Sequence, residues 1–161
     1  MSGGFTVRRW SAAERLDEIM AMIHASFAEF QPPSGVLSET VADLAKRQRD
    51  GLVLVAQAGD DLIGSVFAAP KDNALYLTRM AVLPAWRKRG VGHALMQAAE
   101  AEARALGLAR LSLRVRQTLP ANRAYFEGQG FLVIGEGQDP GRTPYFMMHG
   151  PMLKPRSQPA G

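Results

Sequence analysis

Cysteine is absent from this chain of 161 residues, and histidine occurs only three times. Without a thiol the protein forms no disulfide framework, no thiolate nucleophile and no cysteine-ligated metal centre. His24, His93 and His149 lie far apart in the sequence, and no His-Glu-x-x-His motif is present. We therefore expect no metal cofactor.

Long apolar runs are also missing, since no window approaches the roughly 18 apolar residues that a membrane span requires. Residues 1–6 lack the basic and apolar segments of a secretion signal. We expect a cytoplasmic protein with no membrane partner. A chain of this length buries roughly 70% of its unfolded surface, and 47% of its residues are hydrophobic. The composition predicts a single domain over residues 1–161, with residues 151–161 as a flexible tail.

Aromatic residues are scarce at 7%, and acidic residues are outnumbered, with 15 Asp plus Glu against 19 Lys plus Arg. The net charge of +4 favours anionic ligands without identifying one. Basic residues gather in three clusters: Lys46, Arg47 and Arg49; Arg87, Lys88 and Arg89; Arg110, Arg114 and Arg116. A nucleic-acid surface is one interpretation of these clusters. Ordinary solvated faces account for most of them, so we expect no nucleic-acid partner.

Hydrophobic periodicity predicts a strand over residues 5–9, followed by a helix from Ser11 to about Phe30. Ser11 and Glu14 have the spacing of a capping box, in which hydroxyl and carboxylate satisfy each other's backbone amides. After a proline-rich loop, Ser38 is the expected cap of a second helix, which ends in basic residues.

The middle of the chain is rich in strands. Apolar runs at residues 52–58 and 62–69 flank residues 59–61 and predict a hairpin. A turn at residues 70–73 leads into residues 74–83, which are apolar on both faces, as expected for a central strand.

The rest of the chain alternates helices and strands. The expected elements are a helix over residues 91–106, a strand over 111–116, a helix over 120–129 capped by Thr118, and strands over 131–135 and 143–149. Together with the earlier elements, this order predicts an α/β or α+β fold, with helices on both faces of one sheet.

The turn between the central strand and the helix at residues 91–106 has the chemistry of an anion site. The first amides of a helix lack intrahelical partners and lie at the positive end of its dipole. Gly90 and Gly92 allow close approach to a phosphate, and Arg87, Lys88 and Arg89 add mobile charge. The pattern is neither a Walker loop nor a complete dinucleotide fingerprint. A merely well-formed helix start is the alternative.

Residues 82–95, Val-Leu-Pro-Ala-Trp-Arg-Lys-Arg-Gly-Val-Gly-His-Ala-Leu, resemble the acetyl-CoA signature of the GNAT N-acetyltransferases, Arg/Gln-x-x-Gly-x-Gly/Ala. Residues 122–131, Asn-Arg-Ala-Tyr-Phe-Glu-Gly-Gln-Gly-Phe, are similar to the family's second signature. The family's element order also matches the predicted one. The resemblance implies a mixed, mostly antiparallel sheet of six to seven strands.

The resemblance also implies a set of residues that bind acetyl-CoA. Met80, Ala81 and Val82 would run beside the pantetheine arm, with a backbone amide near Val82 donating to the thioester carbonyl. The other implied cofactor residues are Arg87, Lys88, Arg89, Gly90, Val91, Gly92 and His93 at the pyrophosphate, with Asn122 near the sulfur and Phe126 beside it. Helix capping is the alternative role for Asn122.

The chain departs from the family pattern at the catalytic acid. The family's common tyrosine corresponds to Phe126, and Tyr125 stands one residue earlier. Neighbouring helical residues point about 100° apart, so Tyr125 is either a packing residue or, in an unusual register, the acid. Tyr125 is our candidate catalytic residue.

No general base is evident, because residues 74–83 contain no carboxylate and only Asp72 lies just before them. The candidates are Glu29, Glu39 and His149, and an acceptor amine of low pKa would need none of them. By resemblance the acceptor binds near Phe27, Glu29, Phe30 and His149, with residues 137–145 opposite. Apolar groups with few carboxylates favour a small or amino-acid-like amine over a polycation.

The sequence therefore predicts an N-acetyltransferase that uses acetyl-CoA and a small-molecule amine in a ternary complex, without an acyl-enzyme. A non-catalytic acyl-CoA-binding or sensing module is the alternative, because Phe126 replaces the tyrosine and the central strand has no carboxylate. The family resemblance also allows a homodimer.

Overall fold

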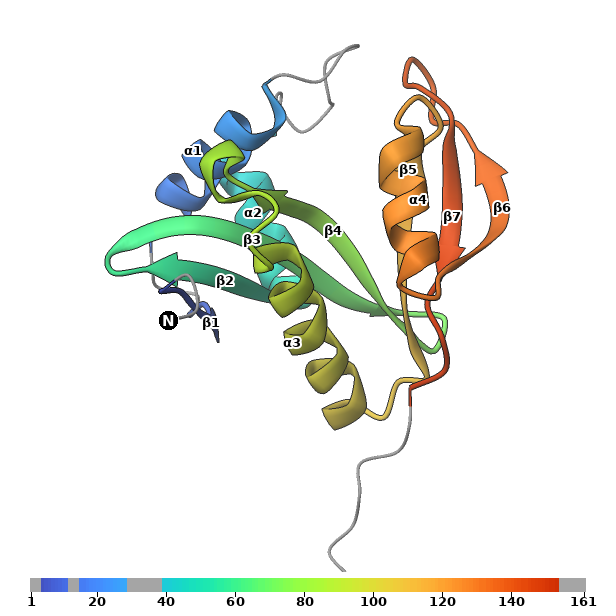
Figure 1. Cartoon of the computed structure of the whole chain (residues 1–161), viewed down its shortest axis with the longest axis horizontal. Helices are drawn as coiled ribbons and strands as arrows, with labels where there is room; N and C mark the ends of the chain where they lie inside the picture. Colours follow the sequence, from blue (N-terminus) through green and yellow to red (C-terminus); the bar gives the residue numbers. More distant parts are fainter. Residues whose placement is uncertain (1–3, 12–14, 29–38, 154–161) are drawn as a thin grey trace, which may run out of the picture. The chain divides into compact units, whose positions relative to one another are not determined.

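The computed structural model describes residues 4–11, 15–28 and 39–153. Figure 1 shows the elements in these ranges, which follow the predicted order. They are β1 (Thr6–Arg9), α1 (Leu16–Phe27), α2 (Val41–Asp50), β2 (Leu52–Ala58), β3 (Asp61–Lys71), β4 (Ala74–Val82), the 3₁₀ turn η2 (Pro84–Trp86), α3 (Val91–Ala105), β5 (Arg110–Arg116), α4 (Pro120–Gly128), β6 (Leu132–Gly137) and β7 (Tyr145–His149). Within the described ranges, no helix has the length and apolar character needed to cross a membrane.

The seven strands form one sheet in the order β1-β2-β3-β4-β5-β7-β6. Four of the described strand pairs are antiparallel: β1 with β2, β2 with β3, β5 with β7 and β6 with β7. β4 and β5 are parallel and pair Ala74, Leu75 and Tyr76 with residues 110–112. The predicted α/β fold with a mostly antiparallel sheet is therefore confirmed.

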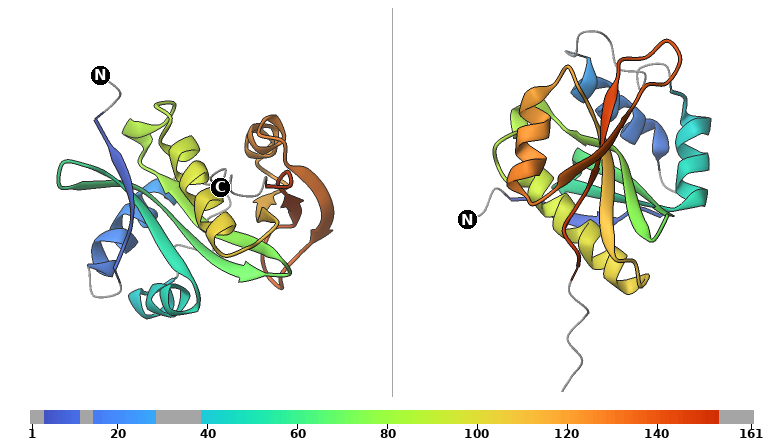
Figure 2. Two further views of the ribbon diagram at one scale, coloured as in Figure 1. Left: turned by 90° about the horizontal axis from the view of Figure 1, so that it is seen from below. Right: turned by 90° about the vertical axis from the view of Figure 1, so that its right-hand side faces the viewer.

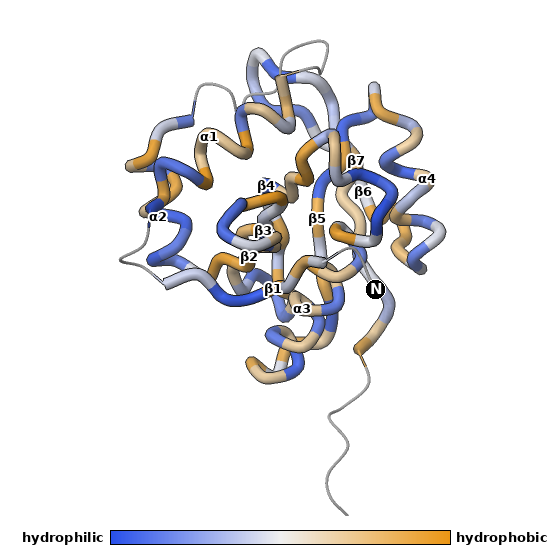
Figure 3. Tube along the Cα trace, turned by 60° about the vertical axis from the view of Figure 1, so that its left-hand side comes forward, coloured by the Kyte–Doolittle hydropathy of each residue, from blue (hydrophilic) through white to orange (hydrophobic). Residues whose placement is uncertain are grey.

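The chain divides into two compact units, of which the first comprises residues 1–69 and 77–98. Its main core lies between helices α1 and α2 and one face of β2 and β3, and includes Ile19, Ile23, Leu44, Val53, Val55 and Phe67. Figure 3 colours α2 as mostly hydrophilic, in agreement with Leu44 as its only buried residue. Opposite, a Cβ at Gly64 would lie 3.1 Å from Val91 and 3.3 Å from Leu95. Helix α3 therefore covers the other face of β3 (Figure 2).

The second unit comprises residues 70–76 and 99–161. Helix α4 packs on the sheet through Phe126, whose ring lies edge-on to buried Phe131 at 5.5 Å, and Arg123, 4.6 Å from the Phe146 ring. The amide of Leu153 donates to the Ala109 carbonyl at 2.8 Å, so the chain stays attached to this unit beyond β7. The rest of the predicted tail lies outside the described residues.

The start of α1 differs from the sequence prediction. Its N-cap is Arg15, with no side-chain cap, so the capping box predicted for Ser11 and Glu14 is wrong at Ser11, and Glu14 lies outside the described residues. The physical reason lies in the sheet. The amide of Trp10 donates to the Val53 carbonyl at 2.9 Å and keeps the chain extended just before Ser11.

The N-cap residues of the other two helices also differ from the predicted ones. Helix α2 begins with a capping box in which Thr40 accepts from the Asp43 amide at 3.3 Å and Asp43 accepts from the Thr40 amide at 2.8 Å. Thr40 therefore replaces Ser38, which lies outside the described residues, as the cap. Helix α4 has Leu119 at its N-cap and no side-chain cap, so the prediction of Thr118 is wrong. The Leu119 amide donates to a carbonyl of β5 at 3.0 Å, which places Thr118 in the preceding turn.

The turn predicted at residues 70–73 is present but shorter. Strand β3 continues to Lys71, so only Asp72 and Asn73 form the turn, with φ of 51° and 62°. Positive φ at both central residues is the type I′ geometry that suits the twist of a hairpin. Asp and Asn tolerate this conformation better than most residues.

Candidate active site

The chain leaves β4 through η2 and a four-residue turn before α3 begins at Val91. Within that turn Lys88 has φ of 63° and Gly90 has φ of 83°. Glycine adopts positive φ without the steric cost that a Cβ imposes. A Cβ built on Gly90 would meet no atom within 4 Å, so the backbone there also faces open space.

The first turn of α3 leaves backbone donors available. The Ala94 amide bonds to the Gly90 carbonyl at 3.0 Å, whereas the amides of Val91, Gly92 and His93 precede the first intrahelical bond. No acidic residue occurs in this turn to offset the helix dipole. This part of the first unit is therefore suited to bind an anion such as a phosphate.

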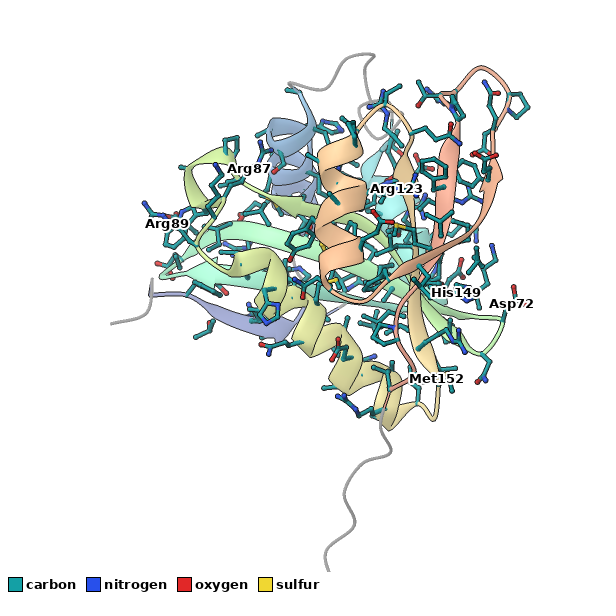
Figure 4. The ribbon with its side chains drawn as sticks, turned by 45° about the vertical axis from the view of Figure 1, so that its right-hand side comes forward. Asp72, Arg87, Arg89, Arg123, His149 and Met152 are labelled. Carbon is teal, nitrogen blue, oxygen red and sulfur yellow. The ribbon has the colours of Figure 1, made fainter. Side chains whose placement is uncertain are left out.

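The three basic side chains of the turn differ in their surroundings. Arg87 donates from Nη2 to the Ser26 carbonyl at 2.8 Å and from Nε to the Val82 carbonyl at 3.3 Å. Because Ser26 lies in the last turn of α1, this guanidinium caps that helix. The Arg89 guanidinium lies 5.0 Å from the Trp86 ring centre, and Lys88 is exposed. Figure 4 labels Arg87 and Arg89 at this turn. The prediction of mobile charge at all three residues is therefore wrong for Arg87.

The predicted pantetheine-binding residues form the end of β4. Ala81 is buried in the core beneath α1 and α2, and Met80 and Val82 are partly exposed. The Leu83 amide donates to the Ile63 carbonyl at 2.9 Å, which holds this end of β4 against β3. The bonds from this stretch to a ligand stay a prediction.

Glu39 is held by two arginines that sequence reasoning did not select. Arg79 of β4 donates to both of its carboxylate oxygens at 2.8 Å, and Arg47 of α2 donates to Oε2 at 3.1 Å. Burial raises the pKa of Glu39, but the hydrogen bonds and charges of Arg79 and Arg47 outweigh it and hold the pKa below its usual value. A paired carboxylate with a lowered pKa is a poor general base, which argues against that candidate role. The available signal was Arg79 itself, the single charged residue in residues 74–83.

The second unit carries the predicted residues of α4. Asn122 is exposed and makes no side-chain cap, so its alternative role in capping is wrong. Tyr125 is 41% exposed, which argues against the packing role, and partial burial raises the pKa of its hydroxyl. Its ring meets Phe126 edge-on at 5.1 Å. Phe126, at the family's tyrosine position, is the residue of this pair that packs against Phe131.

His149 ends β7, where it pairs with Ser112 on one side and Leu132 on the other. Burial and the charge of Arg110 lower the pKa of His149, and the charge of Asp72 partly offsets them. In Figure 4 it lies towards the end of β7 that leads to Met152. Its predicted contact with the acceptor stays untested.

Of the other predicted acceptor residues in the first unit, only Phe27 is described, whereas residues 137–145 link β6 to β7 in the second unit. Phe27 lies in the last turn of α1 and packs partly buried against the core of the first unit. Glu29 and Phe30 lie outside the described residues. The first unit therefore brings together residues 80–93, whereas Asn122, Tyr125, Phe126 and His149 belong to the second unit.

The fold and the glycine turn before α3 define an α/β protein that carries its candidate ligand site after the central strand. A family model described as the Acetyltransferase (GNAT) family matches residues 9–131. Because that match spans most of the chain, the protein belongs to the GNAT acetyltransferase family, whose members use acetyl-CoA. No curated protein sequence matches the chain.

Solved structures of the same fold cover nearly the whole chain. Ard1 from Thermoplasma volcanium superposes with a TM-score of 0.77 at 16% identity, covering 94% of this chain and 99% of that one. The ribosomal-protein-S18-alanine N-acetyltransferase from Escherichia coli gives 0.72 at 20% identity, covering 98% and 99%. PaiA N-acetyltransferase from Thermoplasma acidophilum, in complex with coenzyme A, gives 0.74 at 20% identity, covering 91% and 98%. At such identities the likeness shows the fold alone.

Proposed function

We propose that this protein transfers the acetyl group of acetyl-CoA to the amine of a small or amino-acid-like molecule, by direct attack in a ternary complex. Family membership supports the donor, and the lack of cysteine argues against a thioester on the enzyme. The observation that carries the proposal is the start of α3. There an acid-free first turn follows Gly90, whose φ of 83° opens the backbone to a ligand.

In this proposal the diphosphate of acetyl-CoA binds at the turn, mainly through backbone amides, because these are fixed in place before the ligand arrives. The residues involved are Lys88, Arg89, Gly90, Val91, Gly92 and His93. Met80, Ala81 and Val82 bond the pantetheine arm through their backbone groups. Arg87 supports the turn by holding the carbonyls of Ser26 and Val82.

The transfer is a nucleophilic acyl substitution. The neutral amine nitrogen attacks the thioester carbonyl carbon, the C–N bond forms and the C–S bond breaks. A backbone amide near Val82 donates to the carbonyl oxygen as negative charge develops there. The nitrogen loses its extra proton to water, and the sulfur leaves as a thiolate.

The leaving thiol needs little help from an acid. Its pKa resembles that of free cysteine, about 8.5, so the thiolate departs near neutral pH. In this proposal Tyr125, one residue before the family's tyrosine position, donates the proton that the sulfur takes up. Asn122 and Phe126 contact the cofactor near the sulfur by family resemblance. The raised pKa of the Tyr125 hydroxyl keeps it protonated at neutral pH.

Thermal unfolding with and without acetyl-CoA tests the donor assignment. A ligand at a hundred times its dissociation constant stabilises a protein by about 2.7 kcal/mol, which shifts the melting temperature by several degrees. We expect that shift with acetyl-CoA and not with ATP or NAD. Thiol release measured with a panel of amines then tests turnover. No shift and no thiol release would overturn the proposal.

A non-catalytic acyl-CoA-binding module is the second candidate. It is favoured by Phe126 at the family's tyrosine position and by the engagement of Glu39 with two arginines. This function predicts a shift in melting temperature with acetyl-CoA and no thiol release with any amine.

A further inference from the structure

The guanidinium of Arg79 is held in one orientation by Glu39. Its Nε donates to Oε1 and its Nη2 to Oε2, both at 2.8 Å, in a side-on bidentate pair. Arg47 binds the same carboxylate, with its Nη2 and Nε at 3.1 and 3.3 Å from Oε2. This pairing uses one edge of the Arg79 guanidinium. It leaves the adjacent edge, formed by Nη1 and the second N–H of Nη2, pointing its donors in parallel.

That second edge of Arg79 makes no hydrogen bond to any residue in the ranges 4–11, 15–28 and 39–153. The Glu39 side chain is only 9% exposed, whereas those of Arg79 and Arg47 are 26% and 34% exposed. Two guanidinium groups surround the Glu39 carboxylate, and their charges also act on Asp43. The cluster of Glu39, Arg47 and Arg79 therefore combines a buried orienting anion with two partly exposed arginine side chains.

The backbone at Arg79 is also unusual. Its φ is 55°, in the left-handed region that residues with a Cβ avoid, although the residue lies inside β4. Such strain persists only where the surrounding structure demands it, and it concentrates at functional sites. An ion pair to a neighbouring helix does not by itself require a strained strand. The strain therefore marks this stretch of β4, which leads directly into Met80, Ala81 and Val82, as a functional part of the strand.

We propose that Arg79, oriented by Glu39, binds a carboxylate of the acceptor, so that the substrates of this protein are amines that also carry a carboxylate. A planar carboxylate presents two oxygens that match a parallel pair of N–H donors. This inference rests on the proposed function.

The position of Arg79 along β4 supports this assignment. It directly precedes Met80, the first of the residues assigned to the pantetheine arm, and one strand residue spans only about 3.3 Å. A carboxylate held at Arg79 therefore belongs to a molecule that lies beside the donor. Within the same cluster Glu39 acts as a positioning residue, because it fixes the guanidinium through both carboxylate oxygens.

The test compares amines that differ only in the carboxylate. Glycine, β-alanine and 4-aminobutyrate are each assayed against their amides by thiol release from acetyl-CoA. We expect at least one acid to exceed its amide tenfold or more in kcat/KM. The difference in amine basicity works against this outcome, because the glycine amide amine has the lower pKa and is more often neutral.

Arg79→Gln is expected to abolish the preference by raising KM for the acid at least tenfold. Arg79→Lys keeps the charge without the fork and should retain only part of the preference, and it serves if Arg79→Gln fails to fold. Lys46→Gln is the matched control, because Lys46 is an exposed α2 cation that pairs with Asp50 at 2.6 Å and leaves the Glu39 cluster intact. It should change nothing.

The outcomes separate the two proposals. Equal kcat/KM for acids and amides, or an acid preference that persists in the folded Arg79→Gln variant, would overturn the inference. Thiol release in the same assays would still support the proposed acetyltransferase function. Turnover only of amines that lack a carboxylate would overturn the inference in the same way. If acetyl-CoA does not raise the melting temperature of the wild-type protein, the proposed acetyltransferase function is itself overturned.

Discussion

The turn before α3 and the helix α4 carry the two signatures of this family, yet they are built differently. The turn is shaped mainly by its backbone. Gly90 has φ of 83°, and Arg87 binds two backbone carbonyl groups. On α4, the exposed side chains of Asn122 and Tyr125 make no hydrogen bond to the described part of the chain. Replacement of a glycine should therefore disturb both the folding and the ligand affinity of the turn. Replacement of an exposed side chain on α4 should change only ligand binding or catalysis.

Replacement of Gly90 should have the largest effect. Gly90→Glu places a Cβ at positive φ and a like charge where we propose that the diphosphate binds, so we expect acetyl-CoA affinity to fall by more than about a hundredfold. Gly107→Glu is the matched control, because Gly107 has φ of 73° and equally open surroundings. Both variants should lose about 1–2 kcal/mol of folding free energy through the left-handed residue. Calorimetric titration with coenzyme A would then separate them, and equal affinities would refute the phosphate assignment.

Removal of the Tyr125 hydroxyl should lower the rate without lowering stability. If Tyr125 donates the proton, Tyr125→Phe reduces kcat by about 10²-fold, at the lower end of general acid catalysis. The melting temperature and acetyl-CoA affinity should not change, because the hydroxyl has no hydrogen-bond partner among the described residues. An unchanged kcat and pH profile would leave Tyr125 as a surface residue with no catalytic part.

The two arginines of the turn should behave differently from each other. Arg87→Gln removes charge-assisted hydrogen bonds between the turn and α1, so we expect a loss of about 1 kcal/mol in folding free energy. Arg89→Gln loses only an exposed contact with Trp86 and should weaken coenzyme A binding at unchanged stability. Denaturant unfolding of both variants measures the contrast. Equal stability of the two variants would show that the Arg87 hydrogen bonds to Ser26 and Val82 do not contribute to the folding free energy.

The smallest expected effect concerns His149. Its pKa is lowered by burial and by Arg110, so as pH falls below the ordinary histidine value near 6.5 the unfolded chain takes up the proton first. Stability therefore declines with falling pH until the folded state is protonated as well. His149→Gln should make a denaturant midpoint slightly less sensitive between pH 7.5 and 5.5. A variant as acid-sensitive as the wild type would place the titrating group elsewhere.

The predictions from the sequence were most accurate where the signal is local. The strand at residues 52–58 was predicted with its observed bounds, and the helix at 91–106 came within one residue, because periodicity and a terminal glycine are features of one short segment. The caps were less accurate. Ser11 has a suitable spacing, but the strand bond from Trp10 to Val53 keeps the chain extended there, and local patterns carry no information about that partner.

The order of the elements, the glycine turn before α3 and the family signature were thus determined by the sequence alone, since each is written within a few consecutive residues. Only the tertiary structure decided which distant groups meet. Glu39 and Arg79 stand 40 residues apart, and Arg87 and Ser26 stand 61 apart. Their side chains are matched by charge and geometry after the sheet and helices have packed. No periodicity or spacing in the sequence encodes that match, because many carboxylates and carbonyls would satisfy the same guanidinium.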